Sequence, residues 1–124
     1  MQAQEKVAYH ITPTVNVPNI LSAGLRPSRS GLDGPGVYVF RGPLSAAVRE
    51  ADLSLTDSLS DTGTDMLAFF RTLSILEVNY SDEDAVSVAW PEYFVFRDLI
   101  PAERLHLVGT FLDTARKLYP NQYN

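Results

Sequence analysis

The chain has 124 residues, with 15 acidic and 10 basic side chains and no cysteine. Its length suits one domain, and we expect a single domain over residues 1–124. Its net charge of −5 makes non-specific nucleic-acid binding unfavourable, because such binding depends on neutralising phosphates. The lack of cysteine excludes disulfides, thiolate metal sites and cysteine nucleophiles.

Strands and helices alternate in the first half of the sequence. Residues 6–11 (KVAYHI) predict a short strand that ends at a turn-forming Thr-Pro. A helix is predicted over 15–23, with a glycine directly after it as a stop signal. A loop rich in Pro, Gly and Ser covers 26–36, and the alternating VYVFR of 37–41 predicts a second strand. Apolar residues at helical spacing then predict a helix over 43–54.

The second half consists mainly of predicted strands. A polar loop over 55–65 precedes the apolar stretch 66–79, in which LSILEV is a strand and MLAFF is either a helical end or another strand. Further strands are predicted over 92–97 and 105–111, and the tail after them contains a short helix. Since the connections between these strands are short, the order of elements indicates an α+β fold with antiparallel or mixed sheets.

Composition also bears on location and ligands. The first ten residues lack the apolar core of a signal peptide, and no apolar run approaches the roughly 18 residues that cross a bilayer. We therefore expect a cytoplasmic protein without a membrane partner. Residues 1–49 carry five basic and two acidic side chains, which would suit a small anionic ligand. Most of these arginines would nevertheless be ordinary solvated surface residues.

Common catalytic and metal-binding motifs are missing from the sequence. The two histidines, His10 and His106, are far apart in the sequence, and without cysteine they do not supply the three or four ligands that are typical of a zinc site. The sequence contains neither a GxxxxGK[ST] phosphate loop nor a GxSxG nucleophile elbow. We expect no metal cofactor.

Three polar residues occupy predicted strands: His10 in YHIT, Tyr38 in GPGVYVF and Glu92 in PEYFVF. Taken singly, each has an ordinary structural interpretation. His10 would be a core histidine with a hydrogen-bond partner, Tyr38 a core residue, and Glu92 a solvated side chain at the start of a strand. Their combination in this order, 28 and 54 positions apart, invites a functional interpretation.

Together with their surroundings, these segments resemble the histidine–tyrosine–glutamate branch of the ADP-ribosyltransferase superfamily. YHIT followed by a helix and AGLRPS, then GPGVYVF, then PEYFVFRDLIPAERLHLV, are similar to three family motifs, and the likeness spans residues 8–108. The branch includes the poly(ADP-ribose) polymerases and small bacterial transferases. The resemblance implies split antiparallel or mixed β-sheets, with two helices in the N-terminal half. The first segment is also similar to RNA 2′-phosphotransferases and DarT-type DNA-modifying transferases.

The resemblance implies an NAD-binding site. His10 would hydrogen-bond the ribose near the adenine end, while the backbone of Ile11 would pair with the nicotinamide carboxamide. Thr12 would add a hydroxyl group. Arg26 and Arg29, on the loop after the first helix, would meet the pyrophosphate.

Catalytic roles follow from the same resemblance. Tyr38 would stack on the nicotinamide ring. Glu92 would bind the 2′-hydroxyl of the nicotinamide ribose and stabilise the positive charge that develops as nicotinamide leaves. With His10, these residues would form the catalytic set.

The implied activity is that of an NAD-dependent mono-ADP-ribosyltransferase, with NAD as co-substrate and a protein, nucleic acid or small molecule as acceptor. By analogy, the chain would be an intracellular bacterial or phage factor such as a toxin. Three alternatives remain open: an NAD glycohydrolase, a phosphotransferase that depends on Arg29 more than on Glu92, and a non-enzymatic module that binds ADP-ribose or a nucleotide.

Overall fold

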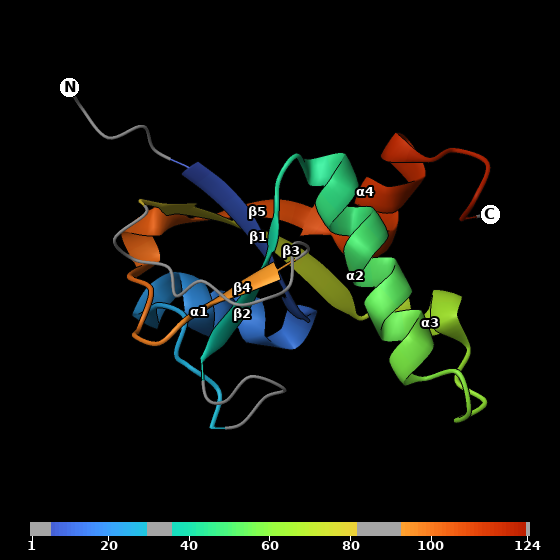
Figure 1. The fold of residues 1–124 in the computed structure, drawn as a ribbon, viewed down its shortest axis with the longest axis horizontal. Coiled ribbons are helices and arrows are strands. Elements are labelled where there is room, and N and C mark those ends of the chain that lie inside the picture. The colour runs from blue at the N-terminus through green and yellow to red at the C-terminus, as the bar shows by residue number, and fades with distance from the viewer. Residues whose placement is uncertain (1–5, 30–35, 82–92, 124) are drawn as a thin grey trace.

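A five-stranded antiparallel sheet organises the protein in the computed structural model, which describes residues 6–29, 36–81 and 93–123. The spatial order of the strands is β4-β2-β1-β3-β5, so the first strand lies at the centre (Figure 1). The strands are β1 Lys6–Pro13, β2 Val37–Arg41, β3 Leu73–Tyr80, β4 Tyr93–Phe96 and β5 Leu105–Thr110.

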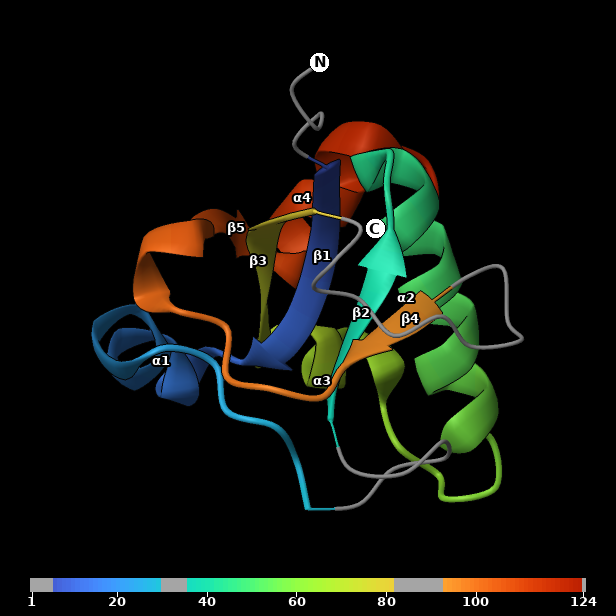
Figure 2. The ribbon, with the colours of Figure 1, turned by 60° about the vertical axis from the view of Figure 1, so that its left-hand side comes forward.

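Helices lie on both faces of this sheet. Figure 2 shows α1 on one side, with α2 and α4 on the other. The α-helices are α1 Val17–Ala23, α2 Leu44–Ser58, α3 Met66–Phe70 and α4 Phe111–Leu118, and 3-10 turns cover Thr14–Asn16 and Ala102–Arg104. None of the helices in the described ranges combines the length and the apolar composition that a membrane span requires.

Each face of the sheet has its own hydrophobic core. The first core joins the sheet to α1 and to the segment after β4, and its members include Ala8, Val39, Leu76, Ile20 and Ile100. The second core joins the other face to α2, α3 and α4, and its members include Tyr9, Ile75, Val48, Phe70 and Phe111. The two-residue period of β1 explains the division, because neighbouring residues such as Ala8 and Tyr9 face opposite sides.

The sheet is also strongly curved. The ring of Tyr80 at the end of β3 contacts the ring of Phe96 in β4, with ring centroids 5.6 Å apart. Two strands, β1 and β2, separate β3 from β4 in the sheet order. Only a sheet that curls toward the side of the first core brings these two rings together.

The predicted strands and the first two predicted helices are confirmed, as is the α+β class. The described strand pairings are all antiparallel and form one sheet, so the mixed alternative was wrong for this part of the chain. MLAFF is the helix α3, and a fourth helix, α4, begins where β5 ends. The short helix predicted in the tail is therefore confirmed as well.

One boundary differs clearly from the prediction. Helix α2 continues to Ser58, into the segment 55–65 that was predicted as a loop. Leu55 lies one helical turn after the fully buried Ala51 and packs against the second core, which extends the apolar stripe of the helix. In the same turn, the Thr56 hydroxyl donates a hydrogen bond of 2.8 Å to Asp52.

Candidate functional site

Strand β1 is paired very differently along its two edges. Along one edge it pairs with β3 over its whole length, from Lys6 to Pro13. Along the other edge it pairs with β2 at two positions only, Ala8 with Arg41 and Tyr9 with Phe40. Beyond Tyr9 the strands β1 and β2 separate, while β2 remains paired with β4. The sheet thus divides into two ladders that share a short seam, and the gap between β1 and β2 follows it.

A side chain bridges the two strands beside this gap. Nδ1 of His10 lies 2.8 Å from the backbone oxygen of Tyr38. A carbonyl oxygen only accepts hydrogen bonds, so Nδ1 carries the proton and donates it. In the neutral imidazole, Nε2 is then left with a lone pair that can accept a hydrogen bond from a ligand.

The surroundings keep His10 neutral. Burial lowers the pKa of the imidazole below its ordinary value, and the hydrogen bond to the Tyr38 backbone opposes this shift only in part. Nε2 makes no hydrogen bond to another residue of the described ranges. The His10 residue as a whole is only partly buried. His10 therefore presents a neutral imidazole with an acceptor nitrogen, not a positive charge.

The gap also affects the backbone of β1. In an antiparallel strand, alternate residues direct their N–H and C=O groups to opposite neighbours. After the pairing with β2 ends at Tyr9, the groups of β1 that face β2 have no strand partner there. A planar amide of a ligand can bind such groups as a further strand would.

The two-residue period of a strand predicts that Ala8 and His10 face a cleft or interface, while Tyr9 and Ile11 face the core. Tyr9 is buried, as predicted, and Ile11 is partly buried against the second core. The prediction that Ala8 faces a cleft together with His10 was wrong, because Ala8 is fully buried in the first core. Helix α1 and the segment after β4 cover this face, which the sequence pattern of β1 does not reveal. Thr12 is also buried.

Tyr38 approaches His10 with its backbone and not with its ring. Val37 and Val39 belong to the first core, while Phe40 packs against the second. The side chain of Tyr38 therefore lies on the face of Phe40, whereas His10 alternates with the face of Ala8. The half-buried ring of Tyr38 packs against that of Tyr93 in β4, with centroids 5.8 Å apart and planes tilted by 37°.

The loop after α1 is fixed at two points. Leu25 forms an isolated β-bridge with Ile100, and Ser28 forms another with Gly36. The bridge at Gly36 is close: a Cβ atom there would lie 2.8 Å from the Phe96 backbone oxygen and would overlap the Val95 side chain. Only glycine allows the loop to approach β4 in this way.

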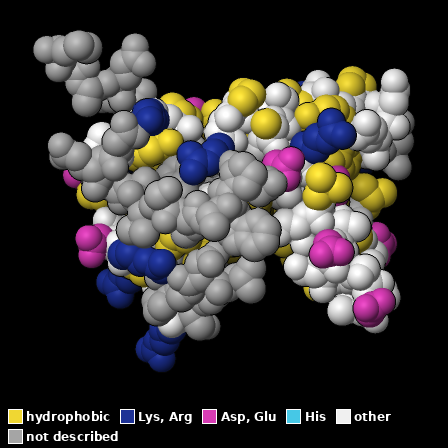
Figure 3. All heavy atoms as spheres, viewed as in Figure 1, with side chains coloured by type: hydrophobic (Ala, Val, Ile, Leu, Met, Phe, Trp, Pro, Cys, Tyr) yellow, Lys and Arg dark blue, Asp and Glu magenta, His cyan; other side chains and the backbone are white. Residues whose placement is uncertain are grey.

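The second bridge places Arg29 near the start of β2, because Arg29 follows Ser28 and the bridge partner Gly36 lies two residues before Tyr38. Arg26 follows the first bridge, which joins the loop to Ile100 in the segment after β4. Both side chains are exposed and make no hydrogen bond or ion pair with the residues that the structure describes. Charged side chains of the two signs are unevenly spread over the face shown in Figure 3. Lys and Arg predominate on the side of α1, and Asp and Glu predominate on the side of α2 and α3.

The third predicted catalytic residue, Glu92, lies outside the described residues. The next residue, Tyr93, begins β4 opposite Phe40, and Val95 lies opposite Tyr38. The structure therefore brings His10 to the backbone of Tyr38 and the ring of Tyr38 to that of Tyr93, while the alternation of the strands directs the two rings to the face opposite the His10 side chain. Tyr93 was not among the predicted site residues. The alternation in EYFVF places it on one face with Val95, but does not indicate which strand lies beside it.

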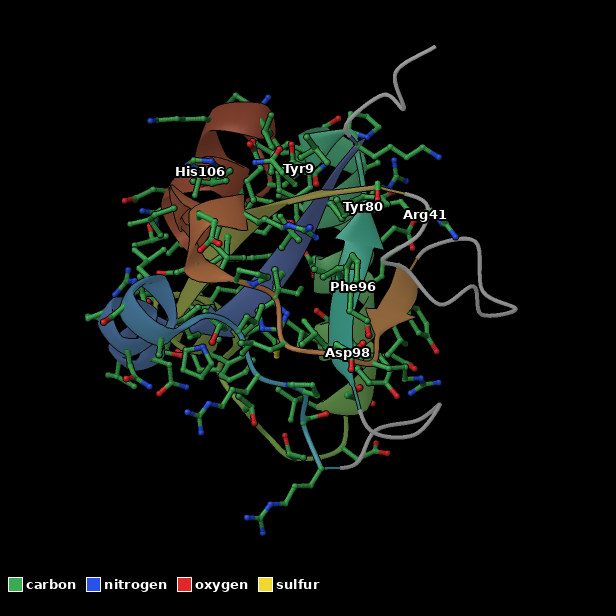
Figure 4. The ribbon with its side chains drawn as sticks, turned by 90° about the vertical axis from the view of Figure 1, so that its left-hand side faces the viewer. Tyr9, Arg41, Tyr80, Phe96, Asp98 and His106 are labelled. Carbon is green, nitrogen blue, oxygen red and sulfur yellow. The ribbon has the colours of Figure 1, made fainter. Side chains whose placement is uncertain are left out.

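A separate hollow lies away from these residues. It has a volume of about 110 Å³ and lies between the end of β3 and the segment after β4. Figure 4 shows three of its lining residues, Tyr80, Phe96 and Asp98. Neither His10 nor Tyr38 lines it.

Comparisons with other proteins identify no relative of this chain. Neither a protein-family model, nor a curated protein, nor a solved structure matches it at a significant level. Among the residues that the structure describes, no group of three or more His, Asp or Glu side chains could hold a metal ion. The functional assignment therefore depends on the local geometry around His10 and on the sequence resemblance.

Proposed function

We propose that the protein is an NAD-dependent ADP-ribosyltransferase that binds NAD at the gap between β1 and β2. One observation carries the proposal: the partly buried His10 bridges the two strands beside this gap, with Nδ1 donating to the Tyr38 backbone and the acceptor Nε2 without a partner in the described ranges. A ribose hydroxyl is a suitable donor to Nε2. This arrangement supports the role that the resemblance gives to His10.

Other residues around the gap fit the remaining parts of NAD. The unpaired backbone edge of β1 at Ile11 would bind the nicotinamide carboxamide, as the resemblance implies. The ring of Tyr38 would stack on the cationic nicotinamide. Arg26 and Arg29, which are exposed and make no ion pair within the described ranges, would bind the pyrophosphate.

The proposed reaction breaks the bond between the nicotinamide nitrogen and C1′ of the ribose. The electron pair leaves with nicotinamide, which becomes neutral, and positive charge develops on the ribose. Glu92 would stabilise this charge through the 2′-hydroxyl. A nucleophile of the acceptor then bonds to C1′, and its proton passes to Glu92 or to solvent.

Release of nicotinamide from NAD tests this proposal. We expect release by the wild type in the presence of protein, single-stranded nucleic acid or water as acceptor. Glu92→Gln keeps the shape of the side chain but removes its charge, and should slow release by about 10²- to 10⁴-fold. Glu103→Gln makes the same chemical change at an exposed residue and should not slow it.

Two results would contradict the proposal. One is equal release of nicotinamide by the wild type and by Glu92→Gln. The other is no release by the wild type with any of the three acceptors. If water alone serves as acceptor, the enzyme is an NAD glycohydrolase that uses the same site.

A second candidate function has one observation in its favour. Arg29 is exposed and has no partner among the residues that the structure describes, as a residue that binds an RNA 2′-phosphate would be. For an RNA 2′-phosphotransferase, Arg29→Ala should abolish NAD-dependent consumption of 2′-phosphorylated RNA, while Glu92→Gln should leave it largely intact. The opposite ranking of the two variants would favour ADP-ribosyl transfer.

A further inference from the structure

The contact between Tyr38 and Tyr93 leads beyond the predicted site residues. Tyr38 lies directly opposite Val95, and Tyr93 lies opposite Phe40, two residues along β4. Tyr93 is therefore the diagonal neighbour of Tyr38 on the same face of the sheet, a position from which aromatic rings can meet. The two rings do meet, with centroids 5.8 Å apart and a tilt of 37°.

This contact limits what the ring of Tyr38 can do. Val95 is fully buried, so the strand beside Tyr38 is firmly packed. The Tyr93 ring packs against the Tyr38 ring at a tilt and so restricts the orientations that the Tyr38 ring can take. A tyrosine ring without such a neighbour would rotate more freely about its side-chain bonds and would lose more conformational entropy on stacking.

We propose that Tyr93 is a positioning residue that orients the Tyr38 ring for stacking on nicotinamide. The inference rests on the proposed function, since it presupposes that Tyr38 stacks on nicotinamide. The contact that carries this inference joins the two rings. Tyr93→Phe should therefore behave like the wild type, while Tyr93→Ala should not.

The first test follows the ring of Tyr38 directly and needs no catalytic activity. The full chain is labelled with 3-fluorotyrosine, and Tyr38→Phe assigns the Tyr38 fluorine resonance. Tyr93→Ala should shift or sharpen this resonance, whereas Tyr93→Phe should change it less. An unchanged Tyr38 resonance in Tyr93→Ala would overturn the proposal.

The second test titrates nicotinamide while the same resonance is observed. Loss of one aromatic contact should weaken binding, so that the dissociation constant for nicotinamide rises by about two- to tenfold in Tyr93→Ala. Equal affinity in Tyr93→Ala and wild type would overturn the positioning role. If nicotinamide does not move the Tyr38 resonance of the wild type, stacking by Tyr38 is contradicted. The positioning role of Tyr93 is then overturned as well, whether or not the two rings pack together.

Kinetics with NAD distinguish positioning from a general structural defect. Tyr93→Ala should raise KM for NAD by about two- to tenfold and leave kcat nearly unchanged. A partly unfolded variant would instead lose kcat at constant KM, and that result would contradict the proposal. Tyr80→Ala removes a ring from the other cross-strand aromatic pair, the one with Phe96, and is the matched control that should leave KM unchanged.

Release of nicotinamide by the wild type separates this inference from the proposed function. If the wild type releases nicotinamide and Glu92→Gln does not, but Tyr93→Ala has wild-type KM and affinity, only the positioning role fails. If the wild type neither binds nor cleaves NAD, the proposed function itself fails.

Discussion

The two edges of β1 differ in how much of the strand is paired with its neighbour. The edge toward β3 is paired from Lys6 to Pro13. The edge toward β2 is paired at Ala8 and Tyr9 only and then depends on the His10 side chain, which donates to the Tyr38 backbone. One strand thus serves as a structural element along one edge, and along the other its backbone groups beyond Tyr9 have no strand partner in the described part of the chain.

This difference has a physical basis. A complete ladder satisfies every backbone group of an edge and leaves none for a ligand. Where two strands separate, the backbone groups between them can bind an external planar amide, at a cost in local stability. We therefore expect substitutions beside β3 to affect mainly folding, and substitutions at His10 to affect mainly NAD cleavage.

The largest expected effect on stability is at Leu76. This residue is fully buried and lies opposite His10 across the complete edge. Leu76→Ala should lower the free energy of unfolding by about 2–5 kcal/mol through loss of apolar contacts and formation of a cavity. Urea unfolding measures the change. Leu107→Ala, at the 51% exposed partner of Leu76 in β5, should cost no more than about 0.5 kcal/mol.

Gly36 tests the separated side of the sheet. In Gly36→Ala, the new methyl group would lie 2.8 Å from the Phe96 oxygen and overlap the Val95 side chain. The strain should lower the free energy of unfolding by about 1–3 kcal/mol, and it should also weaken NAD binding, because the bridge to Ser28 holds the arginine loop. If Gly36→Ala unfolds at the wild-type urea concentration, the close approach of this loop to β4 is wrong.

His10 should show a small effect on stability and a large one on function. His10→Ala removes the hydrogen bond to Tyr38 and should cost about 0.5–1.5 kcal/mol. His10→Asn can keep a donor near the position of Nδ1 but loses the acceptor Nε2, so it should be more stable than His10→Ala and equally poor in nicotinamide release. Full activity of His10→Asn would show that Nε2 does not bind substrate. His106→Ala, at an exposed histidine on β5, is the matched control.

The smallest expected effect is a dependence of stability on pH. Burial lowers the pKa of His10 in the folded state below its unfolded value, which is about 6.5. As the pH falls, His10 is protonated in the unfolded chain at a higher pH than in the folded protein. The contribution of neutral His10 to the free energy of unfolding is therefore complete above about pH 6.5 and declines below that value. Urea unfolding of the wild type and of His10→Asn is measured at several values between about pH 7 and pH 5. The difference between their free energies of unfolding should become smaller as the pH falls. A constant difference over this interval would contradict the assignment of His10 as a buried neutral group.

Much of the local structure could be predicted from the sequence, because it depends on neighbouring residues. The alternation of Val37 and Val39 with Tyr38 and Phe40 is that of a strand with two different faces, and both faces occur as expected. Gly24, with φ of 92°, ends the predicted first helix because glycine adopts this conformation with little strain. Leu55 shows the limit of such patterns, since its contact with the second core extends α2 through a segment of polar composition.

The sequence by itself therefore determined where the strands and helices form and which residues could carry the proposed chemistry. Only the tertiary structure decided that Ala8 is covered, that β1 and β2 separate after Tyr9, and that Tyr93 packs on Tyr38. The physical reason is distance along the chain. The spacing of apolar residues specifies the faces of one element, but the neighbour of each face depends on strand order and on contacts such as that of His10 with Tyr38, 28 residues apart.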